Sequence, residues 1–325
     1  MEDDAIMTSP LEMKYTEKKL KGMDFLTVTD FTADDLYYLL DKAVKMKKDF
    51  EAGKGSQPLA GKTLGMVFEK NSTRTRISFD VGMNQLGGHS LMMNPNDLQI
   101  GRGETIADTA KVFSEYLDAV MIRANSHDMV KEFAENADIP VINGLTDKFH
   151  PCQALADLLT MLEVKGKLAG LKAAYIGDGN NVAHSLLLAC AKMGIDTAIA
   201  TPAGYEMDTD VAQEVEQEAK EAGAVFTQTT DPAEAAADAD FLYTDVWVSM
   251  GEDSEKEARL KAFEGYQIDE QLAKHAKPDY TFMHCLPAHR GLEVSADVID
   301  GSHSVVFQQA GNRMHAQKSL LAALL

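Results

Sequence analysis

Hydroxyl and guanidinium groups are concentrated in the segment Ser72-Thr73-Arg74-Thr75-Arg76, between a short apolar run and a stretch with helical periodicity. At such a position the free backbone N–H groups and the positive end of the helix dipole meet. Guanidinium groups match phosphate oxygens with a forked pair of donors, and hydroxyl groups add short hydrogen bonds. The segment therefore predicts an anion site, although a helix cap followed by two solvated arginines explains it equally well when it stands alone.

A histidine and a glutamine lie three residues apart after the apolar run 141–143. His150 stands where a helical pattern begins, so its ring can donate to an oxygen that becomes anionic, and the Gln153 carboxamide can bind a neighbouring amide. Alone, such a histidine more often caps a helix or packs in a core. A functional role for the pair is favoured by its position, because open α/β sheets bind their ligands at the carboxyl ends of strands.

Two glycines, Gly177 and Gly179, follow the apolar run 173–176 and precede Asn181. A dinucleotide-binding fingerprint requires glycine or alanine three places after the second glycine, and Val182 stands there. Nicotinamide binding is therefore disfavoured. Two interpretations stay open: a tight turn between a strand and a helix, and an asparagine side chain that binds a substrate carboxylate.

An aspartate, Asp245, follows the apolar run 241–244 and stands two places before the only tryptophan. Ser249, Met250 and Gly251 come shortly after it. A carboxylate at the end of a strand, followed by small and flexible residues, indicates a loop that binds a cation and contains a hinge. An isolated aspartate at this place more often caps a helix.

The apolar run 281–284 leads into the segment His284-Cys285-Leu286-Pro287. Pro287 fixes the turn, so the carbonyl groups of Cys285 and Leu286 are candidates for acceptors that face a cleft. A nucleophilic pair of Cys285 and His284 is disfavoured because neighbouring residues of a strand face opposite sides.

Acidic residues outnumber basic ones by 51 to 31, for a formal net charge of -20. This surplus argues against nucleic acid and against an anionic membrane as partners. A phosphate-bearing substrate must therefore bind in a local positive pocket. The 325 residues, of which 45% are hydrophobic, suffice for two domains of ordinary size.

The three cysteines, Cys152, Cys190 and Cys285, are far apart and form no C-x-x-C pair. Neither a disulfide framework nor a zinc knuckle is predicted, and we expect a cytoplasmic location. The first twenty residues are rich in charge and lack the apolar stretch of an export signal. No run of about 18 apolar residues occurs, so no membrane span is expected.

Apolar runs alternate with helical patterns along the whole chain, which predicts the α/β fold class with parallel sheets flanked by helices. Residues 32–50 start with a capping box and place apolar residues on one face of a helix, and 152–164 predict a helix that crosses between domains. A last helix is expected over 314–325. The expected strands are 64–68, 90–93, 119–122, 141–143, 173–176, 197–200, 225–227, 241–244, 281–284 and 305–307.

Taken in order, these segments resemble the ornithine carbamoyltransferases, over essentially the whole chain from Lys21 to Leu325. Residues 68–76 resemble the carbamoyl-phosphate motif of that family, 150–153 its H-P-x-Q motif, and 245–251 with 284–287 its ornithine-specific motifs. The resemblance implies two Rossmann-like domains: residues 1–152, joined by the C-terminal helix 313–325, for carbamoyl phosphate, and 153–312 for ornithine. It also implies no metal or organic cofactor, and a homotrimer or a multiple of trimers with sites at the subunit interfaces.

The resemblance further implies roles for individual residues. The expected catalytic residues are Arg123, His150, Cys285 and Asp245. The expected ligands of carbamoyl phosphate are Ser72, Thr73, Arg74, Thr75, Gln99, Arg123, His150, Gln153, Cys285, Leu286 and Arg313, with Gln99 supplied by a neighbouring subunit. The expected ligands of ornithine are Asn181, Asp245, Ser249 and Met250.

The implied reaction is attack of the neutral δ-amine of L-ornithine on the carbamoyl carbon, which gives L-citrulline and phosphate. Donors at the oxygen that becomes anionic are the largest expected contribution. The proton acceptor stays open among the leaving phosphate, Cys285 and Asp245. So does the direction used in the cell, biosynthetic or degradative.

Three alternatives compete with this interpretation. Aspartate as the acceptor is disfavoured because Asp245 would repel it and Arg102 is the only base in the loop 99–104. Putrescine lacks the α-carboxylate and α-amino groups that the segment 249–251 is suited to hold. From a different class, a catalytically silent ligand-binding protein is disfavoured by the set Arg74, Arg123, His150, Cys285 and Arg313.

Overall fold

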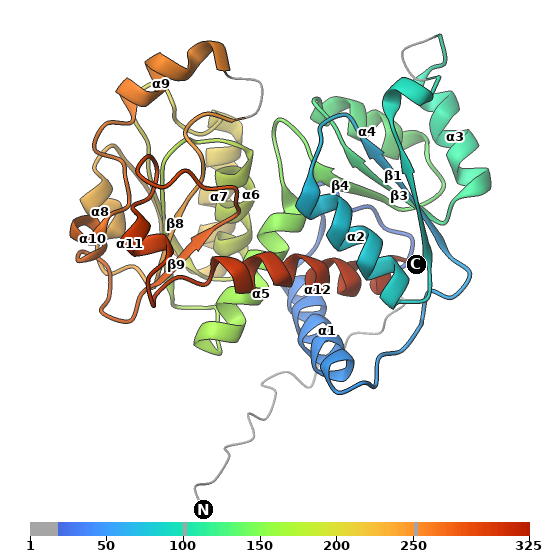
Figure 1. The fold of residues 1–325 in the computed structure, drawn as a ribbon, viewed down its shortest axis with the longest axis horizontal. Coiled ribbons are helices and arrows are strands. Elements are labelled where there is room, and N and C mark those ends of the chain that lie inside the picture. The colour runs from blue at the N-terminus through green and yellow to red at the C-terminus, as the bar shows by residue number, and fades with distance from the viewer. Residues whose placement is uncertain (1–18, 100–102, 250–252) are drawn as a thin grey trace, which may run out of the picture.

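The structure is a computed structural model that describes residues 19–99, 103–249 and 253–325, and these form two lobes around two parallel sheets (Figure 1). The first sheet contains β1 (Thr63–Phe68), β2 (His89–Met93), β3 (Ala119–Arg123) and β4 (Val141–Leu145), in the order β2-β1-β3-β4. The second contains β5 (Lys172–Ile176), β6 (Asp196–Ala200), β7 (Phe226–Thr229), β8 (Phe241–Thr244) and β9 (Thr281–His284), in the order β7-β6-β5-β8-β9. The predicted α/β class is confirmed.

Helices flank both sheets and connect the lobes (Figure 1). The first lobe has η2 (Val28–Asp30), α1 (Ala33–Glu51), α2 (Thr73–Gln85), η3 (Pro95–Asp97), α3 (Ile106–Tyr116) and α4 (His127–Asn136). The second has α6 (Asn181–Lys192), α7 (Thr209–Ala222), α8 (Pro232–Ala236), η4 (Asp253–Glu255), α9 (Lys256–Ala262), α10 (Glu270–Ala273) and α11 (Ala296–Ile299). Two helices, α5 (Pro151–Lys165) and α12 (Val306–Leu324), cross between the lobes. No helix in the described ranges is both long and apolar enough to cross a membrane.

The order of the strands places the polar segments at two switch points. In the first sheet the chain proceeds from β1 to β2 on one side and then returns to β3 on the other. In the second sheet the same reversal separates β5 from β8. Ligands of open α/β sheets bind outside the carboxyl ends of the strands at such points. The segments that begin at Ser72, Arg123, Asn181 and Asp245 follow or end these four strands.

The first helix forms as its sequence predicts. Thr32 is the N-cap of α1 and its hydroxyl accepts a hydrogen bond from the N–H of Asp35 (3.2 Å), while the Asp35 carboxylate accepts one from the N–H of Thr32 (3.1 Å). This reciprocal pair is the capping box. Leu36, Leu39 and Leu40 are buried on the inner face of the helix.

The expected strand 305–307 is wrong. The chain makes one isolated parallel bridge, from Ser304 to Phe282 at the edge of β9, and then enters α12 at Val306. Val306 is buried whereas Phe307 is 74% exposed, as on two sides of a helix. A short apolar run does not by itself distinguish a strand from a buried helix, which explains the error. The last helix therefore begins at 306 and not at 314, and it packs on α1, α2 and α5.

Candidate active site

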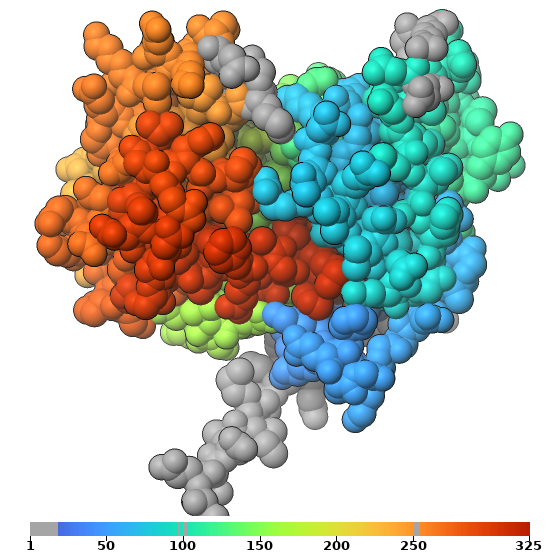
Figure 2. Space-filling model, viewed as in Figure 1, coloured from blue at the N-terminus to red at the C-terminus, as the bar shows by residue number. Residues whose placement is uncertain are grey.

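A cavity of about 460 Å³ lies between the lobes, and the molecular surface is hollowed there (Figure 2). Its walls come from the segments after β1, β3, β4, β5, β8 and β9 and from α12. The cavity brings together most of the residues singled out in the sequence, namely Ser72, Thr73, Arg74, Thr75, Arg123, His150, Gln153, Asn181, Asp245, Ser249, Cys285, Leu286 and Arg313.

Two predicted residues are not placed at the cavity. Gln99 is exposed and is not part of the cavity wall of its own chain. Met250 lies outside the described residues.

The amino end of α2 forms one wall of the cavity. Ser72 is the N-cap, and its Oγ accepts a hydrogen bond from the N–H of Thr75 (3.2 Å). No acidic residue occupies the first turn of α2, so no carboxylate of that turn offsets the positive end of the helix dipole. Free N–H groups, hydroxyl groups and the dipole thus favour a bound anion at this wall.

Three guanidinium groups share this part of the cavity. Arg123 is only 4% exposed, and burial together with the charges of Arg313 and Arg74 lowers its pKa to about 10. Within the described residues, its Nε has no hydrogen-bond partner. Buried cations are normally paired, so this crowding indicates a site for a multiply charged anion such as phosphate.

His150 is buried beside the same arginines. Its backbone N–H donates to Ser185 Oγ (2.8 Å), which ties the start of α5 to α6. Burial, reinforced by the charges of Arg313, Arg123 and Arg74, holds the pKa of the ring well below its usual value. The imidazole is therefore neutral near pH 7, and its Nδ1 has no partner among the described residues. A neutral ring in this position can donate one hydrogen bond to a substrate oxygen.

A row of hydrogen bonds joins α2, α12 and α5 below these groups. Arg313 donates from Nη2 to Thr75 Oγ1 (3.2 Å) and from Nη1 to Gln153 Oε1 (2.8 Å). Its Nε donates to Gln317 Oε1 (3.1 Å). These three hydrogen bonds fix the plane of the Arg313 guanidinium group between Thr75 of α2 and Gln153 of α5.

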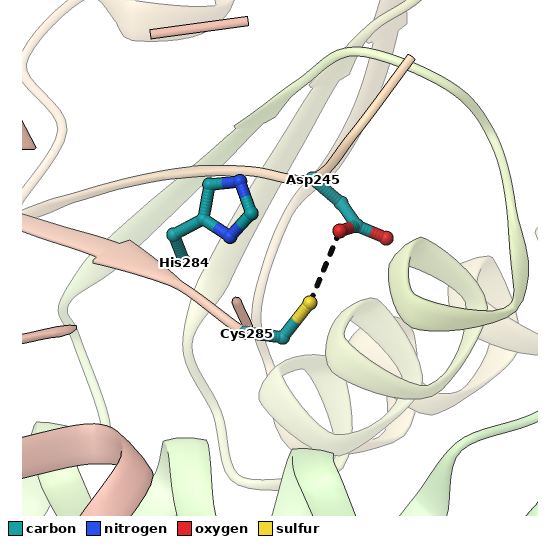
Figure 3. A group of neighbouring side chains, drawn as sticks. All are labelled: Asp245, His284 and Cys285. Carbon is teal, nitrogen blue, oxygen red and sulfur yellow. Dashed lines mark hydrogen bonds between the residues drawn. The ribbon is translucent and has the colours of Figure 1, made fainter. Parts of the chain in front are cut away.

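The opposite wall is built around the Asp245 carboxylate. Its Oδ1 accepts a hydrogen bond from the Cys285 thiol (3.1 Å), and its Oδ2 accepts one from Asn180 Nδ2 (3.1 Å). Figure 3 shows the thiol directed at the carboxylate. Burial, followed by the Asp245 charge, raises the pKa of the Cys285 thiol well above its usual value, so the thiol keeps its proton. An anionic group held at 6% exposure can bind an ammonium group.

His284 lies beside Asp245 and Cys285, but its ring accepts a hydrogen bond from the backbone of its own segment. Its Nδ1 accepts a hydrogen bond from the Leu286 N–H (2.9 Å), and its Nε2 faces Glu293 Oε1 (3.2 Å). Leu286 has a left-handed backbone (φ 58°) that this bond supports, and the bond from Leu286 to Pro287 is cis. A Cys–His nucleophile is therefore not formed, although the two side chains are closer than strand alternation predicts.

One group of side chains has the types that metals prefer. Donor atoms of Asp245, His284 and Cys285 lie within 4.8 Å of one another. Both ring nitrogens of His284 already face protein partners, and the Cys285 thiol donates its hydrogen bond to Asp245. The arrangement fits hydrogen bonding within the protein better than a resident ion.

The glycines after β5 have a packing reason. A Cβ atom on Gly179 would lie 2.4 Å from the backbone nitrogen of Met207, so no side chain fits there. The tight-turn interpretation accounts for this glycine without a nucleotide.

Sequence reasoning missed two residues of this region. Asn180 caps α6, accepting hydrogen bonds from the N–H groups of Val182 and Ala183 (3.0 and 3.1 Å), and also holds Asp245. Its place just before a helical pattern was the available signal. Arg259 of α9 donates to Asp178 Oδ2 (2.9 Å), and no local pattern indicates this long-range pair.

Two family models together match almost the whole described chain. Residues 23–163 match "Aspartate/ornithine carbamoyltransferase, carbamoyl-P binding domain", and residues 169–324 match "Aspartate/ornithine carbamoyltransferase, Asp/Orn binding domain".

Similar proteins carry the corresponding name. The ornithine carbamoyltransferase of Anoxybacillus flavithermus is 60% identical over 94% of this chain and 98% of its own length, and that of Bacillus subtilis is 57% identical over 95% and 96%. The solved structure of ornithine carbamoyltransferase from Pyrococcus furiosus superposes with a TM-score of 0.91 at 54% identity, covering 94% of this chain and 97% of that one. With the geometry of the cavity, these matches show that the chain belongs to the aspartate/ornithine carbamoyltransferase family.

Proposed function

We propose that the chain transfers the carbamoyl group of carbamoyl phosphate to the δ-amine of L-ornithine, giving L-citrulline and phosphate. One observation carries the proposal: a single cavity has three guanidinium groups at one wall and a hydrogen-bonded carboxylate at the other. The first wall suits a dianion and the second an amino group. The ornithine carbamoyltransferases at 57% and 60% identity support the same reaction.

In this proposal carbamoyl phosphate binds at the amino end of α2. Ser72, Thr73, Arg74 and Thr75 hold the phosphate with N–H, hydroxyl and guanidinium donors. Arg123 Nε and His150 Nδ1 are supporting evidence, because each is buried and has no partner within the described residues. Donors of this kind stabilise the carbamoyl oxygen as it becomes anionic, together with Thr75 and Arg313, and each contributes a rate factor of about 10²–10³.

Three acceptors contact the carbamoyl amino group in this proposal. Gln153 presents its Oε1, and the backbone carbonyls of Cys285 and Leu286 accept from the same NH2. The wall position of all three residues supports this assignment. Because NH2 is a donor, acceptors are the groups that recognise it.

Ornithine occupies the opposite wall. Asp245 and Ser249 bind its α-amino group, Asn181 binds its α-carboxylate, and Met250 is assigned a backbone contact by resemblance alone. The Asp245 carboxylate is held by two donors, which supports a fixed orientation for the amino acid.

The reaction forms a bond from the δ-nitrogen to the carbamoyl carbon and breaks the bond from that carbon to the phosphate oxygen. Arg123 and His150 stabilise the tetrahedral intermediate, and Asp245, which Cys285 holds, orients ornithine through its α-amino group. The Cys285 thiol keeps its proton, which leaves the departing phosphate or the Asp245 carboxylate to take the proton of the amine. Holding both substrates in one cavity supplies much of the remaining acceleration.

We further propose a cytoplasmic homotrimer, or a multiple of trimers. The supporting surface combines α2 and the edge strand β2, where Ile77, Val81, Leu91 and Met92 are between 38% and 54% exposed. Apolar side chains gathered at an unpaired strand edge favour contact with another copy. Gln99 follows β2 and in this assembly reaches the cavity of a neighbour. The proposed lobe division is 1–152 with 313–325 for carbamoyl phosphate, and 153–312 for ornithine.

A panel of acceptors tests the proposal. Purified protein is incubated with carbamoyl phosphate and one of L-ornithine, L-aspartate or putrescine, and the carbamoylated products are quantified. Citrulline should dominate because Asp245 repels aspartate, and because putrescine leaves the polar groups of the second wall unpaired. Carbamoyl-aspartate or carbamoyl-putrescine as the main product would replace ornithine with another acceptor.

A further inference from the structure

A buried carboxylate lies one layer beneath the cavity. Asp157 is on α5, is completely buried, and is not part of the cavity wall. Its Oδ1 accepts hydrogen bonds from Gln153 Nε2 (2.8 Å) and Gln309 Nε2 (2.8 Å), and its Oδ2 accepts one from the Tyr243 hydroxyl (3.2 Å). Nothing in the proposed reaction uses this group. Burying a carboxylate costs free energy, so a role for Asp157 in holding its hydrogen-bond partners is expected.

The first of these bonds determines how Gln153 faces the cavity. A carboxylate only accepts hydrogen bonds and a guanidinium group only donates them. With Asp157 on one side and Arg313 on the other, the carboxamide has one satisfied orientation: nitrogen inward and oxygen toward Arg313 and the cavity. The oxygen has a second lone pair, so it can also accept from a substrate NH2.

The second bond acts on the segment after β9 in the same way. Gln309 of α12 points its Nε2 at Asp157, so its Oε1 faces the other way and accepts a hydrogen bond from the backbone N–H of His284 (2.9 Å). His284 immediately precedes Cys285 and Leu286, whose carbonyls belong to the other acceptor set. The Asp157 carboxylate therefore orients Gln153, whose oxygen is one acceptor for the carbamoyl amino group. Through Gln309 it also holds the backbone just before the other two acceptors, the carbonyls of Cys285 and Leu286.

We propose that Asp157 is a positioning residue that makes the carbamoyl-phosphate site selective for an acyl phosphate with an amino group. It does so by holding Gln153 with its oxygen toward the cavity and by fixing Gln309 against the backbone of His284. The inference rests on the proposed function. Without the carboxylate, Gln153 can turn its NH2 toward the cavity, where it repels the substrate NH2. An acyl phosphate with a methyl group in place of the NH2 then loses less binding free energy relative to carbamoyl phosphate, because it leaves fewer acceptors of the site unpaired.

The charge state of Asp157 supports this role. Burial raises its pKa to about 6, so it is a carboxylate at neutral pH and takes up a proton in weak acid. The titratable groups that face it are Arg313 of α12, Tyr243 of β8, Cys190 of α6 and Cys285 after β9. Burial raises the pKa of both thiols and of the Tyr243 phenol, so they stay protonated while Arg313 stays charged. Asp157 is thus the member of this group that changes charge near pH 6.

The test compares carbamoyl phosphate with acetyl phosphate, which replaces the NH2 by a methyl group and keeps the phosphate. Dissociation constants of both ligands and of inorganic phosphate are measured by calorimetry for the wild type, for Asp157→Leu and for Tyr243→Phe. The control Tyr243→Phe removes the phenol hydrogen bond to the same carboxylate and the one that Gln309 Nε2 donates to the phenol (3.1 Å), but it leaves Gln153 and Gln309 held by Asp157.

We expect Asp157→Leu, which removes the acceptor oxygen for both glutamines, to narrow the ratio of the two acyl-phosphate constants about tenfold, the size of one charge-assisted hydrogen bond, while the constant for phosphate changes less than about twofold. Tyr243→Phe should keep the wild-type ratio. A ratio in Asp157→Leu equal to that of the wild type, or an equal weakening of phosphate binding, overturns the inference. Failure of the proposed function is a separate result, because it appears in the wild type as absence of citrulline.

A measurement on the unmodified protein covers the case that Asp157→Leu does not fold. In the wild type, the ratio of the two dissociation constants is measured between about pH 7.5 and about pH 5. This range includes the pKa of Asp157, which burial raises to about 6. Ionisation of the ligand phosphate affects both acyl phosphates alike and cancels in the ratio. Protonation of the Asp157 carboxyl group is followed by 13C NMR over the same range, and it weakens both bonds from the glutamines because a charged acceptor binds more strongly than a neutral one. A ratio that narrows while Asp157 takes up its proton supports the inference, and a ratio that stays constant through that step overturns it.

Discussion

The Cys285 thiol donates a hydrogen bond to the Asp245 carboxylate across 3.1 Å, and this contact joins the chain after β9 to the chain after β8. Because burial and the neighbouring carboxylate raise the pKa of the thiol, Cys285 acts as a donor to Asp245 and not as a thiolate nucleophile. The side chain orients the ornithine wall, whereas its backbone carbonyl is assigned to the donor substrate.

Replacing Cys285 tests this division of roles. Cys285→Ala removes one donor from Asp245, so we expect kcat/KM for ornithine to fall about tenfold and its pH profile to differ from that of the wild type. Affinity for carbamoyl phosphate should stay nearly unchanged. Cys285→Ser keeps a donor and is the control, with a smaller loss. A pH profile of Cys285→Ala that superimposes on the wild type would show that the thiol only packs.

The anion site is tested with two arginines of one helix. Arg74 is part of the cavity wall, whereas Arg76 is exposed and lies outside it. Arg74→Ala should lower both the affinity for carbamoyl phosphate and kcat, by about 10² or more in kcat/KM, because a preorganised charge is lost. Arg76→Ala is the matched control and should change either value little. Equal effects of the two substitutions in steady-state kinetics would remove the assignment of the phosphate to the cavity.

Selectivity for the acceptor follows from the second wall. Asp245, Ser249 and Asn181 can pair with the α-groups of ornithine, and putrescine leaves them unpaired. Unpaired buried polar groups can reduce kcat/KM by about 10⁴. We therefore expect L-ornithine to exceed putrescine by about that factor in the wild type, and Asp245→Asn to reduce the preference. Comparable efficiencies for the two amines in the wild type would contradict this assignment.

Stability in weak acid depends on a histidine outside the cavity. Burial and the charges of Lys47 and Lys318 lower the pKa of His315 to about 4. The unfolded chain therefore binds a proton below about pH 6.5 that the folded protein refuses, so the free energy of unfolding falls as the pH decreases through this range. His315→Gln should lessen the loss between pH 7 and 5 by about 1 kcal/mol in urea unfolding. The exposed His89, changed to glutamine in the same way, is the control, and an equal change in the two variants would contradict the assignment to His315.

Assembly is tested at the edge of the first sheet. Leu91 on β2 is 46% exposed, and Val225 before β7 in the other lobe is 61% exposed. Leu91→Lys should dissociate the assembly and reduce activity, since a charge is placed in an apolar contact, whereas Val225→Lys should leave both unchanged. Light scattering during size-exclusion chromatography measures the mass. A wild-type protein that elutes as a monomer, or a Leu91→Lys variant of unchanged mass, would refute this surface.

The sequence predicts what depends on local patterns. The capping residues Thr32 and Asp35 mark the start of α1, and the residues after each apolar run identify the switch points. Placement of most candidate residues in one cavity follows because the carboxyl ends of parallel strands share an edge.

Other features depend on contacts between distant segments. The apolar residues 305–307 belong to α12, because tertiary packing decides between a strand and a helix for so short a run. The roles of Asn180, Arg259 and Asp157 arise from partners that are 65, 81 and up to 152 positions away. No local pattern distinguishes such a buried polar residue from one that faces solvent.

The most direct test of the account measures citrulline and phosphate in the same sample. Purified wild-type protein receives carbamoyl phosphate with and without L-ornithine, and both products are followed over time. The account predicts equal molar amounts of citrulline and phosphate that depend on ornithine, because the amine attacks the carbon that releases phosphate. Phosphate release at the same rate without ornithine, or no citrulline with both substrates present, would contradict carbamoyl transfer as the function of this cavity.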